Sequence, residues 1–211
     1  PSHGLPESVL RKMERKGLVL IDATCPFVKR AQLLASRLSE KGYHVVIAGQ
    51  KTHPEVVSLI SFAHGKASIV RTPQDVEKVG QNKKIGLISQ TTQSVENFQK
   101  IVRRLRAKAE DCKIYDTICR ETSERQNEAR DLARKSDIMI VIGGKNSANT
   151  AVLYRICKKL TCAYHVESAE ELTPDWFLKK EKVGITAGTS TPNWVIRDVV
   201  KSLRRIKLHS A

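Results

Sequence analysis

Two cysteines of this sequence occur in the same local motif. Cys25 ends the run Asp-Ala-Thr-Cys, and Cys119 ends the run Asp-Thr-Ile-Cys 94 residues later. Each cysteine follows a β-rich run and precedes a helix-like stretch, where backbone N–H groups and the helix dipole stabilise a thiolate. The pair therefore suits iron–sulfur ligation or nucleophilic catalysis. The structural alternative is a pair of buried cysteines that were duplicated together with the surrounding sequence.

The other three cysteines, Cys112, Cys157 and Cys162, have no partner of this kind. We expect them to be ordinary small buried residues. A total of five cysteines argues against a disulfide framework and favours a cytoplasmic protein.

An imidazole and a carboxylate stand together in His53-Pro54-Glu55, at an expected helix start. An ionised glutamate would be favoured there by the helix dipole alone, which is the structural alternative. In the functional interpretation, burial raises the pKa of Glu55 and makes it a proton donor. His3 lies at a similar turn near the start of the chain and is a candidate for the same site.

Neutral hydrogen-bond donors stand at several other expected helix starts: Thr91, Ser147, Asn149 and Ser190. Such residues are most often helix N-caps. Several helix N-termini that point into one cavity would instead bind a phosphate group. The run at 143–146, Gly-Gly-Lys-Asn, resembles a phosphate loop only loosely, because it lacks the spacing of both the Walker and the GxGxxG motifs.

An internal repeat indicates the elements that carry these residues. The offset of 94 also aligns 45–55 with 139–149, and 84–92 matches 182–190 after a small change in length. Apolar β-branched runs that alternate with amphipathic helices predict parallel α/β units. We therefore expect quasi-equivalent α/β domains at 23–115 and 116–211. If they face each other about a pseudo-axis, the polar strand ends converge on one central pocket.

Residues 1–22 are interpreted as the remnant of an earlier copy. They consist of a polar turn, a helix over Pro6–Lys16 and a strand that ends at Ile21. The cysteine of that first copy would lie ahead of residue 1.

The composition excludes few classes of protein. Lys and Arg number 37 against 22 Asp and Glu, which gives a net charge of +15. This charge fits a solvated basic surface or an anionic partner, but no nucleic-acid motif accompanies it. The longest apolar runs are strand-sized, well below the roughly 20 residues of a membrane helix.

The motifs together resemble the 4-hydroxy-3-methylbut-2-enyl diphosphate reductase family over essentially the whole chain. The matching runs are Asp-Ala-Thr-Cys-Pro at 22–26, His-Pro-Glu at 53–55, Ser-Gln-Thr-Thr at 89–92, Asp-Thr-Ile-Cys at 116–119, Gly-Gly-Lys-Asn-Ser-Ala-Asn at 143–149 and Thr-Ala-Gly-Thr-Ser-Thr-Pro at 186–192. At Ala148 many family members have a second serine.

The resemblance implies a pseudo-threefold α/β protein with a 4Fe–4S cluster in a central cavity. Cys25 and Cys119 match two cluster ligands, and the third is expected in an N-terminal segment ahead of this chain. Glu55 matches the acid that relays a proton to the leaving hydroxyl. His3, His53, Thr91, Ser147, Asn149 and Ser190 match residues that bind the diphosphate or line its pocket. The reaction yields isopentenyl and dimethylallyl diphosphates in the methylerythritol phosphate pathway.

The resemblance also implies ferredoxin or flavodoxin as electron donor, with no role for a membrane or for nucleic acid. With two of three cysteines, this chain alone is expected to be inactive and to bind a cluster poorly. The alternatives are a non-catalytic α/β module that binds phosphate or nucleic acid, and a cysteine-nucleophile enzyme with His53 as base. No triad order or nucleophile-elbow motif supports the second alternative.

Overall fold

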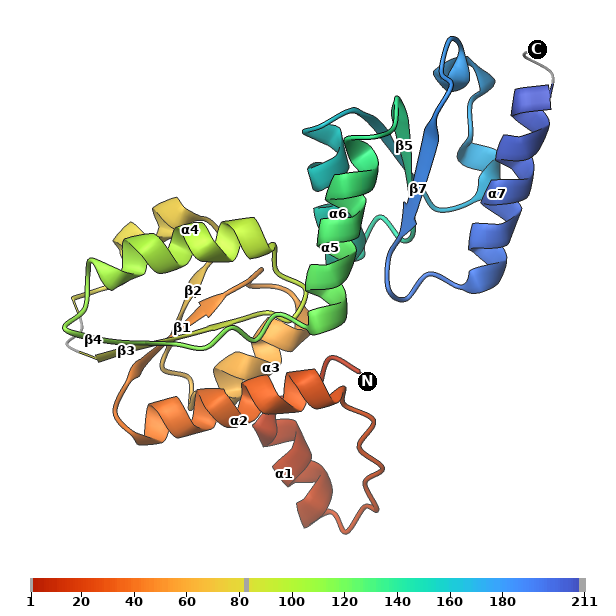
Figure 1. Ribbon diagram of the computed structural model, residues 1–211. Coiled ribbons are helices and arrows are strands. Elements are labelled where there is room, and N and C mark those ends of the chain that lie inside the picture. The colour runs from red at the N-terminus through yellow and green to blue at the C-terminus, as the bar shows by residue number, and fades with distance from the viewer. Residues whose placement is uncertain (1, 82–83, 209–211) are drawn as a thin grey trace. The chain divides into compact units, whose positions relative to one another are not determined.

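The computed structural model describes residues 2–81 and 84–208. The chain divides into two compact units, Pro1–Cys119 (unit 1) and Arg120–Ala211 (unit 2) (Figure 1). The expected domain boundaries at residues 23 and 116 stay a prediction. Among the described residues, no helix is both long and apolar enough to span a membrane.

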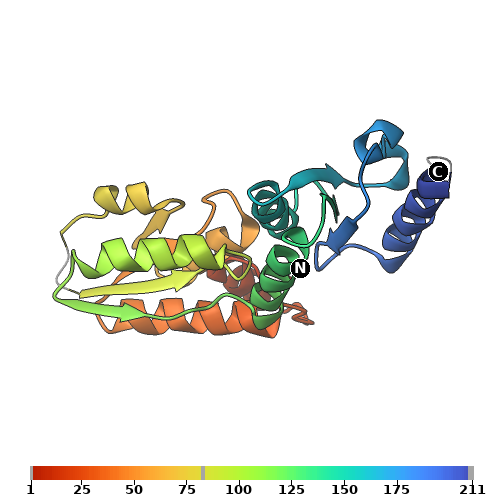
Figure 2. The same ribbon diagram turned by 45° about the horizontal axis from the view of Figure 1, so that its top comes forward.

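Unit 1 is built on a four-stranded parallel sheet in the order β2-β1-β3-β4. The strands are β1 (His44–Ala48), β2 (Ala67–Val70), β3 (Lys84–Ser89) and β4 (Asp111–Ile114). Helices α2 (Pro26–Glu40) and α3 (Pro54–Phe62) cover one face, while α4 (Val95–Arg106) and the 3-10 helix η1 (Pro73–Lys78) cover the other (Figure 2). Helix α1 (Glu7–Arg15) packs against α3.

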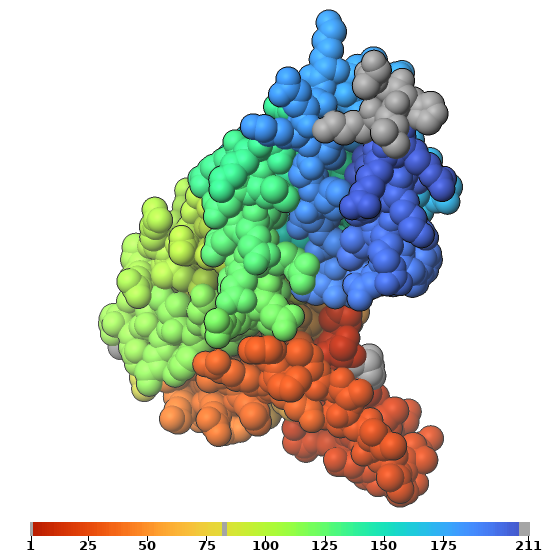
Figure 3. Space-filling model, turned by 45° about the vertical axis from the view of Figure 1, so that its right-hand side comes forward, coloured from red at the N-terminus to blue at the C-terminus, as the bar shows by residue number. Residues whose placement is uncertain are grey.

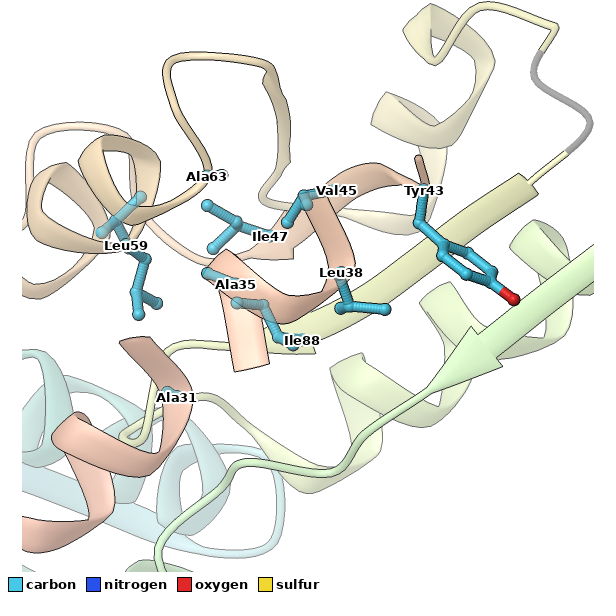
Figure 4. Close-up of a cluster of buried hydrophobic side chains, with 10 residues drawn as sticks. Ala31, Ala35, Leu38, Tyr43, Val45, Ile47, Leu59, Ala63 and Ile88 are labelled. Carbon is cyan, nitrogen blue, oxygen red and sulfur yellow. The ribbon is translucent and has the colours of Figure 1, made fainter. Parts of the chain in front are cut away.

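The alternation of side chains along β1 explains this layering. Val45 and Ile47 pack with Leu59 of α3 and with Ala35 and Leu38 of α2 (Figure 4). Their neighbours along the strand point to the opposite face, towards α4. Every residue over 45–48 is fully buried, as a strand covered on both faces requires.

Unit 2 repeats the arrangement with three parallel strands in the order β6-β5-β7. The strands are β5 (Ile138–Ile142), β6 (Cys162–Val166) and β7 (Val183–Ala187). Helices α5 (Arg120–Ala133) and α6 (Ala148–Lys158) cover one face. Helix α7 (Asn193–Leu208) covers the other face, together with the 3-10 helices η2 (Ala169–Glu171) and η3 (Pro174–Phe177).

The structure confirms the expected parallel α/β class, and the order β2-β1-β3 of unit 1 recurs as β6-β5-β7 in unit 2. Two local predictions are wrong. Leu18–Ile21 is not a strand, because no described segment pairs with it, and Val19 and Ile21 are 94% and 92% exposed. Cys162, expected to be buried, is exposed at the first position of β6, whereas Cys157 is buried and Cys112 half-buried.

Candidate active site

Glu55 is a fully buried carboxylate in the first turn of α3. The Thr91 backbone N–H donates to its Oε1 at 2.6 Å, and the Thr91 hydroxyl donates to its Oε2 at 2.8 Å. Burial raises the pKa of Glu55 to about 7, although these two hydrogen bonds act in the opposite direction. The carboxyl group therefore exchanges a proton near neutral pH, and its role as a proton donor stays a prediction.

The register of the sheet explains why Glu55 meets Thr91. Strands β1 and β3 are parallel neighbours, and Ala48 pairs with Ser89 at their carboxyl ends. Each strand is followed by a loop that leads towards the next helix. Gly49 lies close to this meeting point, since a Cβ there would press against Val56 and Gln90. Side chains that follow the two strand ends therefore converge at one edge of the sheet.

His53 caps the N-terminus of α3 beside this carboxylate. Its Nδ1 accepts a hydrogen bond from the Glu55 backbone N–H at 3.2 Å, which leaves Nε2 as the outer ring nitrogen. The ring of His3 lies edge-on against it, with 5.0 Å between centroids and 88° between planes. Burial lowers the pKa of His53, and the neighbouring His3 lowers it further.

A glycine holds the His3 turn against the helices. Gly4 has φ of +76°, a conformation that other residues rarely adopt, and a Cβ there would collide with the amide of Gln32. The next residue, Leu5, accepts a hydrogen bond from the Ser58 hydroxyl through its carbonyl oxygen at 3.0 Å. The first residues of the chain are thus fixed against both α2 and α3.

Both motif cysteines are half-buried and attach to this group through their backbones. The Cys25 N–H donates to the carbonyl oxygen of Ser2 at 3.1 Å, directly before His3. The Cys119 N–H donates to the carbonyl oxygen of Thr91 at 2.9 Å. Direct contacts in unit 1 therefore connect five candidates, His3, His53, Glu55, Thr91 and Cys119, and Cys25 is joined to them through Ser2, the residue before His3.

Two cysteine thiolates are suitable ligands for iron, and Cys25 stands at the N-cap of α2. Within residues 2–81 and 84–208, however, no group of three or more His, Cys, Asp or Glu side chains is arranged to hold a metal. The donor chemistry fits an iron–sulfur cluster, whereas the ligand set is incomplete within this part of the chain.

Unit 2 has a second group of polar residues where β5 meets α6. Ser147 is the N-cap of α6, and its hydroxyl oxygen accepts from the Thr150 N–H at 3.3 Å. Asn149 is 3% exposed, yet neither atom of its side-chain amide has a hydrogen-bond partner. Buried amides are nearly always paired, and an unpaired one destabilises a fold by about 1–3 kcal/mol. Such a group is typical of a binding site for a polar ligand.

Close backbone approaches surround the hydroxyl of Thr150, the residue after Asn149. Gly143 has φ of +145°, and a Cβ there would press on the Thr150 and Thr191 hydroxyls. A Cβ on Gly188, at the end of β7, would collide with the same Thr150 hydroxyl. The candidate Ser190 lies two residues further on, exposed in the turn before α7.

Sequence reasoning missed three polar residues near these positions. The Thr150 hydroxyl and the Nε of Arg125 are buried without a hydrogen-bond partner. The Thr191 hydroxyl donates to the carbonyl oxygen of Ile142 at 3.1 Å and joins the ends of β5 and β7. Each of the two threonines stands next to a predicted site residue in the sequence, and this adjacency is the signal by which they could have been found. Nothing in its local sequence distinguishes Arg125 from the other basic residues of α5.

Comparison with known proteins identifies the family of the chain. A sequence profile of the family described as "LytB protein" matches residues 1–204. The 4-hydroxy-3-methylbut-2-enyl diphosphate reductase of Geobacter metallireducens is 46% identical over 206 residues, which cover 97% of this chain and 73% of that protein. The protein of the same name from Aquifex aeolicus is 42% identical, with coverage of 97% and 72%.

Two solved structures are also similar. A structure of (E)-4-hydroxy-3-methyl-but-2-enyl diphosphate reductase, the terminal enzyme of the non-mevalonate pathway, shares 41% identity at a TM-score of 0.63, over 97% of this chain and 74% of that one. The reductase of Plasmodium falciparum shares 26% identity at a TM-score of 0.88, over 100% and 66%. The chain belongs to the LytB protein family, the family of the 4-hydroxy-3-methylbut-2-enyl diphosphate reductases.

Proposed function

We propose that the protein catalyses the reductive dehydration of 4-hydroxy-3-methylbut-2-enyl diphosphate to isopentenyl and dimethylallyl diphosphates. The observation that carries this proposal is the buried, protonatable Glu55, which is held by Thr91, the residue whose carbonyl oxygen accepts from the Cys119 N–H. Relatives named 4-hydroxy-3-methylbut-2-enyl diphosphate reductase, at 40–46% identity over nearly the whole chain, support the assignment.

Glu55 supplies a proton in this proposal. A pKa of about 7 leaves its carboxyl group about half protonated at neutral pH. The protonated carboxyl donates to the hydroxyl oxygen of the substrate, which then leaves as water. Two electrons and a second proton then complete the isopentenyl or the dimethylallyl product. Thr91 positions the carboxyl group, because it contacts both carboxyl oxygens.

The neutral polar residues bind the diphosphate. In unit 2 the unpaired amide of Asn149 and the hydroxyl of Ser147 are suited to phosphate oxygens at the N-terminus of α6. Ser190 adds a hydroxyl at the start of the next helix. In unit 1, His53 and His3 carry ring N–H donors for the same kind of ligand, and Thr91 lines the site.

Cys25 and Cys119 would hold a 4Fe–4S cluster, which supplies the electrons and an iron with an open coordination position for the substrate. A site of this kind takes three thiolates, and the third is expected from a segment outside this chain. We infer that the 211-residue chain alone binds a cluster incompletely and has little activity. A ferredoxin or flavodoxin would deliver the electrons, and the net charge of +15 suits an acidic donor of this type.

The cluster ligands can be tested by anaerobic reconstitution of the gene product that contains this sequence. Cys25→Ser and Cys119→Ser should each lower the bound iron and the visible absorption of the cluster. Cys162→Ser is the matched control, because Cys162 is exposed in unit 2 and should leave the iron content unchanged. Iron content that is the same in all four proteins would remove Cys25 and Cys119 from the ligand set.

A further inference from the structure

The loop between β5 and α6 begins at the end of a fully buried strand, which lies beneath the surface to which α5 and α7 contribute (Figure 3). It contains the run Gly-Gly-Lys-Asn at 143–146, which the proposed function does not use. A phosphate-binding loop presents backbone N–H groups and a lysine ammonium to its ligand. Here Lys145 binds carboxylates instead. Its N–H donates to Oε1 of Glu167 at 2.7 Å, and its ammonium contacts Oε2 of Glu171 at 2.6 Å. These contacts fix the loop and do not offer Lys145 to a phosphate.

The first residue of the loop is held by His165 of β6. The Nε2 of His165 lies 2.8 Å from the carbonyl oxygen of Gly143. A carbonyl oxygen only accepts, so Nε2 carries the proton and donates it. The imidazole ring also lies against the ring of Tyr154 in α6, with 5.7 Å between centroids. Because the Gly143 N–H donates to the carbonyl oxygen of Val166 at 3.0 Å, β6 fixes both polar backbone groups of this glycine.

Unit 1 has the same backbone contact without the side chain. The Gly49 N–H, at the end of β1, donates to the carbonyl oxygen of Val70 at 3.0 Å. The register of β1 with β2 and of β5 with β6 makes Ile69 the equivalent of His165. An isoleucine has no donor to give to a carbonyl oxygen. The added hydrogen bond is therefore a feature of unit 2, where the loop leads to the proposed diphosphate donors.

The loop determines where these donors lie. The Ser147 N–H donates to the carbonyl oxygen of Gly144 at 2.9 Å, and Ser147 then caps α6. Asn149, with its unpaired amide, stands in the first turn of the same helix. A ligand binds more tightly to donors that are already in place, because less conformational freedom is lost on binding. Contacts that fix 143–145 should therefore raise the affinity for a diphosphate.

We propose that His165 is a positioning residue of the diphosphate site. Its hydrogen bond to Gly143 fixes the loop that places Ser147 and Asn149, and Glu167 acts in the same way at Lys145. His165 acts through the loop and not by contact with the ligand. This inference rests on the proposed function, because it takes a diphosphate as the ligand of these donors.

Replacement of His165 separates the hydrogen bond from the bulk of the ring. His165→Leu removes the donor, whereas His165→Gln keeps an N–H near the position of Nε2. Titration calorimetry with inorganic diphosphate uses the iron-loaded gene product that contains this sequence. His165→Leu should bind about tenfold more weakly than the wild type, and His165→Gln within about twofold of it. Glu167→Ala, at an exposed position outside the core, should also weaken binding.

Tyr164→Leu is the matched control. Tyr164 precedes His165 in β6, points to the opposite face of the sheet and stacks on Trp176, with 3.8 Å between centroids. This variant should lower the melting temperature and leave the diphosphate affinity unchanged. In turnover assays His165→Leu should raise the KM for 4-hydroxy-3-methylbut-2-enyl diphosphate and keep kcat within about twofold, because the interaction contributes to binding and not to the chemical step.

Hydrogen exchange without ligand tests the loop independently of the reaction. Residues 143–145 should exchange faster in His165→Leu than in the wild type and in Tyr164→Leu. Unchanged exchange, or diphosphate affinity equal to that of the wild type in His165→Leu, overturns the proposal and leaves the proposed function standing. Equal loss of affinity in His165→Leu and Tyr164→Leu also overturns it, since the effect would then be a general loss of stability. A wild type that binds no diphosphate contradicts the proposed function itself and, with it, this inference.

Discussion

Replacing Glu55 with glutamine should change how the stability of unit 1 depends on pH. The carboxyl group has a pKa near 4.5 in the unfolded chain and about 7 in the folded protein, because folding buries it. Between these two values the folded state binds more protons than the unfolded state. The free energy of unfolding therefore falls as the pH rises from 4.5 to 7, and the loss is complete above pH 7.

The size of the effect follows from the shift in pKa. A shift of roughly 2.5 units, at 1.36 kcal/mol for each unit, amounts to about 3 kcal/mol. Glutamine resembles the protonated carboxyl group: its oxygen can accept from the Thr91 N–H, and its amide can donate to the Thr91 hydroxyl. Glu55→Gln should therefore match the wild type near pH 4.5 and exceed its stability by about 3 kcal/mol at pH 8.

Urea unfolding followed by circular dichroism at several pH values measures this difference. Both tryptophans, Trp176 and Trp194, belong to unit 2, so their fluorescence reports the unfolding of that unit separately. The matched control is Glu14→Gln, which changes an exposed glutamate of unit 1. The difference in stability between Glu55→Gln and the wild type should grow from pH 4.5 to 8. A difference that stays constant over this range would refute the argument that burial raises the pKa of Glu55.

Two further predictions concern unit 2. Asn149→Leu should keep or raise the melting temperature in calorimetry, because it removes a buried amide without partners. The same variant should bind inorganic diphosphate at least tenfold more weakly in titration calorimetry. Unchanged diphosphate affinity would exclude Asn149 from the site. Gly188→Ala should lower the stability of unit 2 by about 1–3 kcal/mol in urea unfolding followed by tryptophan fluorescence, because its Cβ collides with the Thr150 hydroxyl. Thr189→Ala, at the exposed position after Gly188, introduces no collision and serves as the control, and a neutral Gly188→Ala would show that the strand end has room to move.

The parallel α/β class could be predicted because the strand-sized apolar runs and the internal repeat point to the same elements. Fully buried runs such as 45–48 and 138–142 are short, apolar at every position and rich in Val and Ile, which is typical of a strand in a sheet covered on both faces. The same reasoning failed at Leu18–Ile21. Its composition is that of a strand, but a strand also needs a neighbour that accepts its hydrogen bonds, and local sequence does not provide one.

The candidate site was predictable to a similar extent. The position of Glu55 after a parallel strand predicted a place at the sheet edge and a raised pKa. Its contact with Thr91 depends on the pairing of β1 with β3, which sequence alone does not fix, whereas its contact with His53 is local to the start of α3. The unpaired amide of Asn149 was likewise invisible in the sequence, because hydrogen-bond satisfaction is a property of the folded chain.

The proposed function is tested most directly by measuring anaerobic turnover of 4-hydroxy-3-methylbut-2-enyl diphosphate. The enzyme in this assay is the gene product that contains this sequence, reconstituted with iron and sulfide and supplied with a reductant. The proposed function predicts isopentenyl and dimethylallyl diphosphates from the wild type, and turnover at least 100-fold slower from Glu55→Gln at the same iron content. Absence of both products from the iron-loaded wild type, or wild-type turnover by Glu55→Gln, would contradict it.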